Sequence, residues 1–304
     1  MRKILVATDL SPRADRAGHR AVRLAREAGA SLRTLHVIDA DPRDPYLERL
    51  LQLPVEEIPE ALMRTSDQRL EERLRQWGAD RLPEHSIRCA FGPVHSTIVD
   101  EAVSWGAELI VVGDHGHHFL RDLFIGTTAE GVIHTAPQPV LVVKADLHRA
   151  YRRVLLPIDF SDRSRAAVGL ARRLAPGARL EVLHVVDGGT LDKVHRSGAG
   201  DADRLEHAKE AGRAAREAEL EPFVAALAAE TGGEVRGRVR AGQPPLVICD
   251  HAEQIEADLI VMGTRGLSHW PGVLAGGVAR RVLYNARCDV ALDRAHGEDE
   301  GEGA

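Results

Sequence analysis

Three glycines and a threonine are spaced as a loop that could hold an anion. Gly113 and Gly116 flank two residues, and Gly126-Thr127-Thr128 follows nine residues later, which gives the pattern G-x2-G-x9-G-[ST]. Glycine lets a chain turn sharply and approach a ligand closely, because no side chain intervenes. A helix that opens at Gly126 presents free N–H groups and a dipole that favours negative charge. The Thr hydroxyl adds a donor, or a ligand for a phosphate-bound Mg²⁺.

The pattern is neither the dinucleotide fingerprint GxGxxG nor the Walker A pattern GxxxxGK[ST]. The alternative explanation is simple turn chemistry, which also uses glycine. Phosphate binding is favoured because the pattern spans the end of a predicted strand and the start of a predicted helix.

A carboxylate, Asp9, ends the apolar run KILVATD (3–9). At the carboxyl end of a strand, such a group can bond ribose hydroxyls or hold Mg²⁺. The alternative is that Asp9 caps the following helix or orders the loop. Ligand binding is favoured because Asp159 repeats the residue beside a different loop.

The chain repeats itself with a period near 150 residues. ILVATDLS around Asp9 matches VLLPIDFS around Asp159, and AELIVVGDHG (107–116) matches ADLIVMGTRG (257–266) at the same offset of 150. Such long-period similarity predicts a tandem of two domains, at 1–146 and 150–296. The remaining residues 297–304 are acidic and glycine-containing, and are predicted to be a disordered tail.

The second copy departs from the glycine pattern. Its candidate site residues are Asp159, Gly263, Arg265, Gly266, Gly276 and Gly277. Gly277 stands where the first copy has Thr127, so the backbone N–H survives and the hydroxyl is lost. Either Arg265 and Arg280 supply positive charge to a phosphate instead, or the site is degenerate. We favour weakened or absent nucleotide binding in this half.

Strand and helix patterns alternate in each half. Near-continuous apolar runs at 3–9, 31–39, 86–92, 109–113 and 139–144 indicate strands covered on both faces. Helical patterns lie between them, including one near 60–80. The second half repeats this order, with a longer helical pattern near 203–230. The alternation predicts a parallel sheet with helices on both faces. Ligands bind such sheets outside the carboxyl ends of the strands, where the strand order reverses.

At this point the chain resembles a known family. ATDLS, LHVID, the G-x2-G-x9-G-T loop and APQPVLVVK together are similar to the universal stress protein family, over nearly the whole chain. The resemblance implies an α/β fold of two tandem Rossmann-like domains, each with a five-stranded parallel sheet in the order 3-2-1-4-5.

The resemblance also implies a ligand. Some members of this family bind ATP, and the glycine pattern marks that branch, so the implied cofactor is ATP together with Mg²⁺. Asp9 would contact the nucleoside, and backbone near Val37 would face the adenine. Ribose and phosphates would be held by Gly113, Gly116, Gly126 and Thr127. Family members pair through the fifth strand, which implies an intrachain pseudo-dimer of PVLVVK with DVALD (289–293), or a homodimer.

Composition narrows the class of protein. Hydrophobic residues make up 44% of the 304 residues, and the net charge is −6. That charge argues against nucleic acid or an anionic membrane as the main partner. No apolar run approaches the length of about 18 residues that a membrane-spanning helix needs. The N-terminus reads as a strand rather than a signal peptide, and three cysteines without CxxC spacing argue against a disulfide framework and against a zinc site. We therefore expect a cytoplasmic protein.

No established catalytic motif, such as GxSxG or HExxH, occurs in the sequence. His115, His117 and His118 could ligate a metal, but polar or phosphate contacts are favoured for them. We expect an ATP-binding stress-response or signalling protein with an unknown protein partner, contacted through segments 42–65 and 188–203. The alternatives are a slow ATPase or phosphotransferase, and a nucleotide-free interaction module.

Overall fold

Short runs of Val, Ile and Leu form the buried strands of the first unit, Met1–Ala150. In chain order they are β1 (Lys3–Ala7), β2 (Ser31–Ile38), β3 (His85–Phe91), β4 (Leu109–Gly113) and β5 (Val140–Val143). Their spatial order is β3-β2-β1-β4-β5, and each neighbouring pair is parallel. The predicted order 3-2-1-4-5 is confirmed, and the order reverses between β1 and β4.

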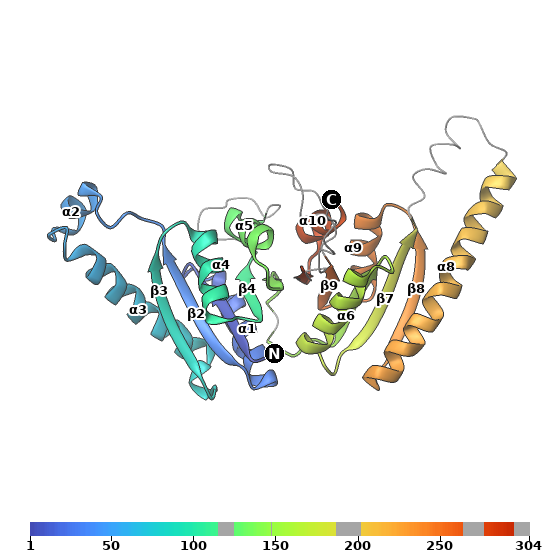
Figure 1. Ribbon diagram of the computed structural model, residues 1–304, viewed down its shortest axis with the longest axis horizontal. Helices are drawn as coiled ribbons and strands as arrows, with labels where there is room; N and C mark the ends of the chain where they lie inside the picture. Colours follow the sequence, from blue (N-terminus) through green and yellow to red (C-terminus); the bar gives the residue numbers. More distant parts are fainter. Residues whose placement is uncertain (115–124, 147, 187–201, 264–276, 295–304) are drawn as a thin grey trace, which may run out of the picture. The chain divides into compact units, whose positions relative to one another are not determined.

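Helices cover both faces of this sheet (Figure 1). Right-handed crossovers place α1 and α3 together on one face, and α4 and α5 together on the other. The helices of the unit are α1 (Ala14–Ala28), α2 (Pro45–Leu51), α3 (Ile58–Trp77), the single turn η1 (Ala79–Arg81), α4 (Val94–Trp105) and α5 (Thr127–Thr135).

The second unit, Tyr151–Ala304, repeats the arrangement. Its strands have the spatial order β8-β7-β6-β9-β10, again with parallel neighbours. The strands are β6 (Arg153–Ile158), β7 (Arg179–Val186), β8 (Val235–Ala241), β9 (Leu259–Gly263) and β10 (Asp289–Asp293). The helices are α6 (Asp162–Leu174), α8 (Ala202–Thr231), α9 (Pro244–Gln254) and α10 (Gly277–Asn285).

This computed structural model describes residues 1–114, 125–146, 148–186, 202–263 and 277–294. Within these ranges no helix combines the length and apolarity that crossing a membrane requires. The predicted tail 297–304, the three histidines between 115 and 118, and most of segment 188–203 lie outside the described residues.

Histidines at matching positions of β2 and β7 connect neighbouring strands. The Nδ1 of His36 lies 2.9 Å from the carbonyl oxygen of Thr8, and that of His184 lies 3.0 Å from the carbonyl oxygen of Ile158. Each ring thus bonds the chain at or just after the end of the central strand. Both histidines therefore have a structural role beside the candidate ligand site.

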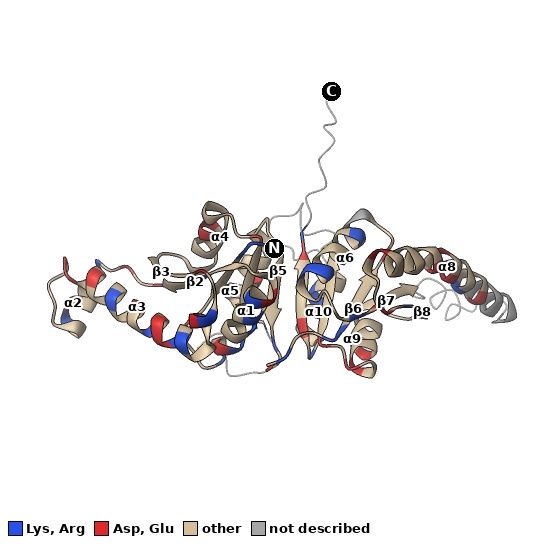
Figure 2. Cartoon of the chain, turned by 90° about the horizontal axis from the view of Figure 1, so that it is seen from below, with Lys and Arg blue, Asp and Glu red and all other residues tan. Residues whose placement is uncertain are grey.

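The face of α3 that packs on the unit is mostly apolar, whereas its outer face carries both signs of charge (Figure 2). The buried residues are Ile58, Ser66, Leu70, Leu74 and Trp77. The indole of Trp77 lies directly over Gly18 of α1, where an added Cβ would be 2.2 Å from the ring. The two helices approach this closely because residue 18 has no side chain.

Replacing Gly18 by Ala should lower the free energy of unfolding by about 1–3 kcal/mol, because the methyl group displaces the indole. Gly169 of α6 is the matched control, since a Cβ there meets nothing within 4 Å. Gly169→Ala should instead raise that free energy by about 0.5–1 kcal/mol, through better helix propensity. Urea unfolding of the two variants measures both effects, and equal behaviour would contradict the proposed packing constraint.

A polar pair between β2 and α4 reappears in the second unit with different chemistry. Arg33 Nη1 donates to Glu101 Oε1 at 2.7 Å in the first unit. At the matching positions, Glu181 Oε1 and His251 Nε2 lie 3.1 Å apart, and both side chains are buried. The Nδ1 of His251 has no hydrogen-bond partner among the described residues. Burial is the largest influence and lowers the pKa of His251; Arg240 and Arg238 act in the same direction, whereas Glu181 opposes them.

A lowered His251 pKa makes stability depend on pH. Above about pH 6.5 the imidazole is neutral in both folded and unfolded chains, so its contribution is constant. As the pH falls below that value the unfolded chain takes up the proton first, and the free energy of unfolding decreases.

Urea unfolding at about pH 7.5 and about pH 5.5 should show this loss in the wild type and a smaller loss in His251→Gln, which keeps the bond to Glu181. Replacing the exposed His85 by Gln is the control. If the free energy of unfolding falls equally with pH in His251→Gln and in the wild type, the pKa of this histidine does not differ between the folded and unfolded chains.

Candidate functional site

A cleft of about 460 Å³ lies beyond the carboxyl ends of β1, β2 and β4. This is where the strand order reverses, as expected for a ligand site in a parallel sheet. Its lining includes Asp9, Val37, Gly113, Gly126, Thr127 and Thr128. These six predicted site residues, drawn from four segments of the first unit, are thus brought together. Gly116, the remaining predicted residue of this unit, lies outside the described residues.

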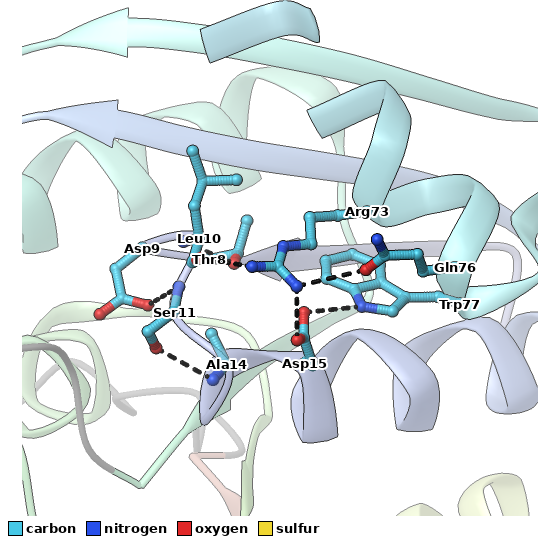
Figure 3. Close-up of polar contacts among 9 residues, drawn as sticks. All are labelled: Thr8, Asp9, Leu10, Ser11, Ala14, Asp15, Arg73, Gln76 and Trp77. Carbon is cyan, nitrogen blue, oxygen red and sulfur yellow. Dashed lines mark hydrogen bonds and ion pairs between the residues drawn. The ribbon is translucent and has the colours of Figure 1, made fainter. Parts of the chain in front are cut away.

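Asp9 stands at the entrance to a tight turn (Figure 3). Its Oδ1 accepts the N–H of Ser11 at 3.0 Å, and Ser11 Oγ accepts the N–H of Ala14 at 3.2 Å, at the start of α1. Between them, Leu10 has a φ of 62°, in the left-handed region that branched and bulky residues rarely adopt. Asp9 therefore orders the loop and also lines the cleft, so both interpretations of this residue fit the geometry.

The two described ends of the glycine loop are joined to each other. Gly113 ends β4, and the N–H of Gly126 donates to the carbonyl of Asp114 at 2.8 Å. The Gly126 amide is therefore engaged within the protein, contrary to the expectation that it is free. Its φ of −62° is open to any residue, so the backbone conformation does not require glycine there. The absence of a side chain at the cleft is what glycine contributes.

The helix dipole still faces the cleft. Helix α5 begins at Thr127, and Gly126 has no side chain with which to cap the first turn. Within the described residues, this end of the helix therefore lacks a side-chain cap from its N-cap position, and such an end can bind an anion. Thr127 is exposed and Thr128 half-buried, and both residues line the cleft.

Three carboxylates, those of Asp9, Asp39 and Asp114, line the same cleft. No Lys, Arg or His contributes to its lining within the part of the chain that the structure describes. Neither Asp39 nor Asp114 is among the predicted site residues. Both could have been found from the sequence, because Asp39 directly follows the apolar strand that includes Val37, and Asp114 follows Gly113. Their position after strands of the sheet was the available signal.

Apolar side chains also line the cleft. Leu35 and Val37 come from β2, Val112 from β4, and Val94 and Ile98 from α4. Val37 is only 9% exposed. A flat ring could pack against these side chains while polar groups of the same ligand reach the carboxylates and the helix end.

The second unit has a cleft of smaller volume at the matching place, about 300 Å³. Asp159, Gly263 and Gly277 line it, together with the larger residues Pro157 and Met262 where the first unit has Ala7 and Val112. The predicted residues Arg265, Gly266 and Gly276 lie outside the described part of the chain.

The carboxylate of Asp159 already accepts hydrogen bonds from residues of its own turn and of α6. Its Oδ1 accepts the N–H of Ser161 at 3.1 Å and the hydroxyl of Ser164 at 2.6 Å. The guanidinium of Arg280, considered above as a phosphate contact, lies 5.5 Å from the ring of Tyr284 on the same helix and does not line the cleft. These contacts favour the interpretation that nucleotide binding is weak or absent in this unit.

Comparison with known proteins agrees with this architecture. Residues 1–144 and again 150–294 match the model of the universal stress protein family. A universal stress protein of Mycolicibacterium smegmatis is 29% identical over 314 residues, which span 96% of this chain and 96% of that protein. One of Methanocaldococcus jannaschii is 34% identical over 144 residues, 47% of this chain and 81% of its own.

Solved structures show the same fold. The crystal structure of a universal stress protein from Archaeoglobus fulgidus superposes with a TM-score of 0.71 at 21% identity, covering 95% of this chain and 97% of that one. Two consecutive family matches span nearly all of the sequence. The chain therefore belongs to the universal stress protein family and carries two tandem copies of its domain.

Proposed function

We propose that the first unit binds ATP with Mg²⁺, and that occupancy of the cleft is a signal read by a protein partner in a stress response. The single observation that supports this most is the convergence of three features on one cleft of about 460 Å³: an apolar wall, a group of carboxylates and an uncapped helix N-terminus. Few ligands match all three, and a nucleotide does, with its ring, its ribose and its phosphates.

The base and the ribose occupy the side of the cleft formed by β1 and β2. An adenine ring packs against Leu35, Val37 and Ile98, which supply apolar surface. Backbone at Val37 faces the ring edge, and the carboxylate of Asp9 accepts hydrogen bonds from ribose hydroxyls. A single carboxylate can do this while its other contact, to the Ser11 N–H, keeps the turn in place.

The phosphates lie at the start of α5. The N–H groups and hydroxyls of Thr127 and Thr128 bond phosphate oxygens, and the absence of a side chain at Gly126 leaves room for them. Phosphates and carboxylates repel each other at short range, so a cation is needed between them. The carboxylates of Asp9 and Asp114 are oxygen ligands of the kind that Mg²⁺ prefers, and when bound, Mg²⁺ neutralises phosphate charge.

The two alternative functions, a slow ATPase or phosphotransferase and a nucleotide-free interaction module, can be distinguished from ATP binding by measuring turnover and by identifying the bound ligand. A slow ATPase or phosphotransferase would release phosphate or transfer it to protein, whereas a binding protein retains ATP. A nucleotide-free module would carry no adenine compound after purification. Pairing through the fifth strands stays a prediction from the family resemblance, and a cytoplasmic location stays a prediction from the sequence.

Gly126→Ala should weaken ATP binding about tenfold or more, because the methyl group takes up space at the cleft. The backbone at this position accepts alanine, so the melting temperature should stay within about 2 °C of the wild type. Calorimetric titration with Mg·ATP measures the affinity. Gly276→Ala in the second unit is the matched control and should bind as the wild type does. Wild-type affinity in Gly126→Ala would refute the placement of the phosphates.

Each chain should bind one nucleotide. Heat-denatured protein should release close to one adenine nucleotide per chain into the supernatant, and calorimetry should give the same stoichiometry.

Asp9→Asn should weaken binding about tenfold or more, since a hydrogen bond to a charged group is lost. Asp159→Asn should leave it unchanged, and chelating Mg²⁺ should weaken it. Two nucleotides per chain, or equal effects of the two Asn variants, would contradict the assignment to the first unit.

A further inference from the structure

The turn that carries Asp9 is held from a distant helix. Arg73 of α3 donates from Nη2 to the carbonyl oxygen of Leu10 at 3.2 Å (Figure 3). Leu10 is the residue with the left-handed φ of 62°, and it directly follows Asp9. A leucine adopts this conformation only where surrounding contacts impose it. The guanidinium thus bonds the strained residue of the turn.

The guanidinium is itself fixed in place. Arg73 Nη1 donates to Asp15 Oδ2 at 2.8 Å and to Gln76 Oε1 at 3.2 Å, and Trp77 Nε1 donates to Asp15 Oδ1 at 3.0 Å. The Arg73 and Asp15 side chains are only 27% and 20% exposed. A planar guanidinium with several bonds can move little. Its contact with Leu10 therefore transmits the position of α3 to the turn.

The second unit holds the same turn in another way. Phe160 follows Asp159 with a φ of 61°, so the left-handed conformation is repeated. There the carboxylate is held locally by Ser161 and by Ser164, and position 14 of the first unit, which matches Ser164, is an alanine. Helix α8 contributes Phe223, whose ring lies 6.5 Å from that of Phe160. The first unit lacks the second serine and has an arginine contact to the turn.

We propose that Arg73 is a positioning residue for Asp9: it holds the Leu10 carbonyl, fixes the left-handed turn and so keeps the carboxylate directed into the cleft. Helix α3 and the occupant of the cleft are coupled through this contact, and the coupling is reciprocal. Any partner that displaces α3 loosens the turn and lowers ligand affinity. Only this effect on affinity rests on the proposed nucleotide function; the effect on the turn does not.

Hydrogen–deuterium exchange without nucleotide tests the positioning directly. In Arg73→Met, peptides covering residues 8–14 should exchange several-fold faster than in the wild type. Arg75→Met is the matched control, because Arg75 lies on the same helix and is exposed, and among the described residues its side chain bonds only the Glu71 carbonyl. It should leave that exchange unchanged. Equal exchange in Arg73→Met and the wild type would overturn the proposal, whether or not the protein binds nucleotide.

Affinity measurements separate positioning from general destabilisation. Arg73→Met should lower the affinity for Mg·ATP about tenfold. Arg73→Lys, which keeps a charged donor, should lower that affinity less. In an Asp9→Asn background, Arg73→Met should have little further effect, because it acts through Asp9. Additive losses in this double-mutant cycle would show that Arg73 acts elsewhere and would overturn the proposal. A wild type that binds no nucleotide defeats the proposed function, and the exchange experiment then decides the role of Arg73.

Discussion

The reversal of strand order between β1 and β4 is the constraint on which the site depends. The chain leaves the two neighbouring strands in opposite directions, to α1 on one face and toward α5 on the other. A crevice opens where the crossovers diverge. The cleft residues follow from this geometry, since Asp9 comes after β1, Asp39 after β2, and Asp114 after β4. Chemistry at this edge can vary while the sheet beneath stays the same.

The two units illustrate that freedom. Both keep the parallel sheet, the histidine bonded to the end of the central strand, and the left-handed residue after the aspartate. They differ in how polar groups are satisfied. An Arg33–Glu101 ion pair in one unit corresponds to a buried Glu181–His251 pair in the other. The aspartate turn is similarly held by a remote arginine in the first unit and by nearby serines in the second. In the second arrangement Oδ1 of Asp159 accepts hydrogen bonds from both Ser161 and Ser164.

Much of the fold could be predicted from sequence, because strand runs and helix periods are local patterns. The order 3-2-1-4-5 came with the family resemblance, and the structure confirms it. Residues directly after strands could also be placed at one edge, as Asp9 and Gly113 were. Contacts between distant segments could not be predicted. The bond from Gly126 to Asp114 depends on how the loop closes, and Arg73 reaches Leu10 across 63 positions of sequence. No local pattern encodes either contact.

The contact between Trp77 and Gly18 has a consequence for how such sequences change over time. An indole fits against α1 only while residue 18 lacks a side chain, and a Cβ there would stand 2.2 Å from the ring. Because the same indole also donates to Asp15, a smaller residue at position 77 would remove both the packing and that bond. We therefore expect substitutions at positions 18 and 77 to be tolerated better together than singly.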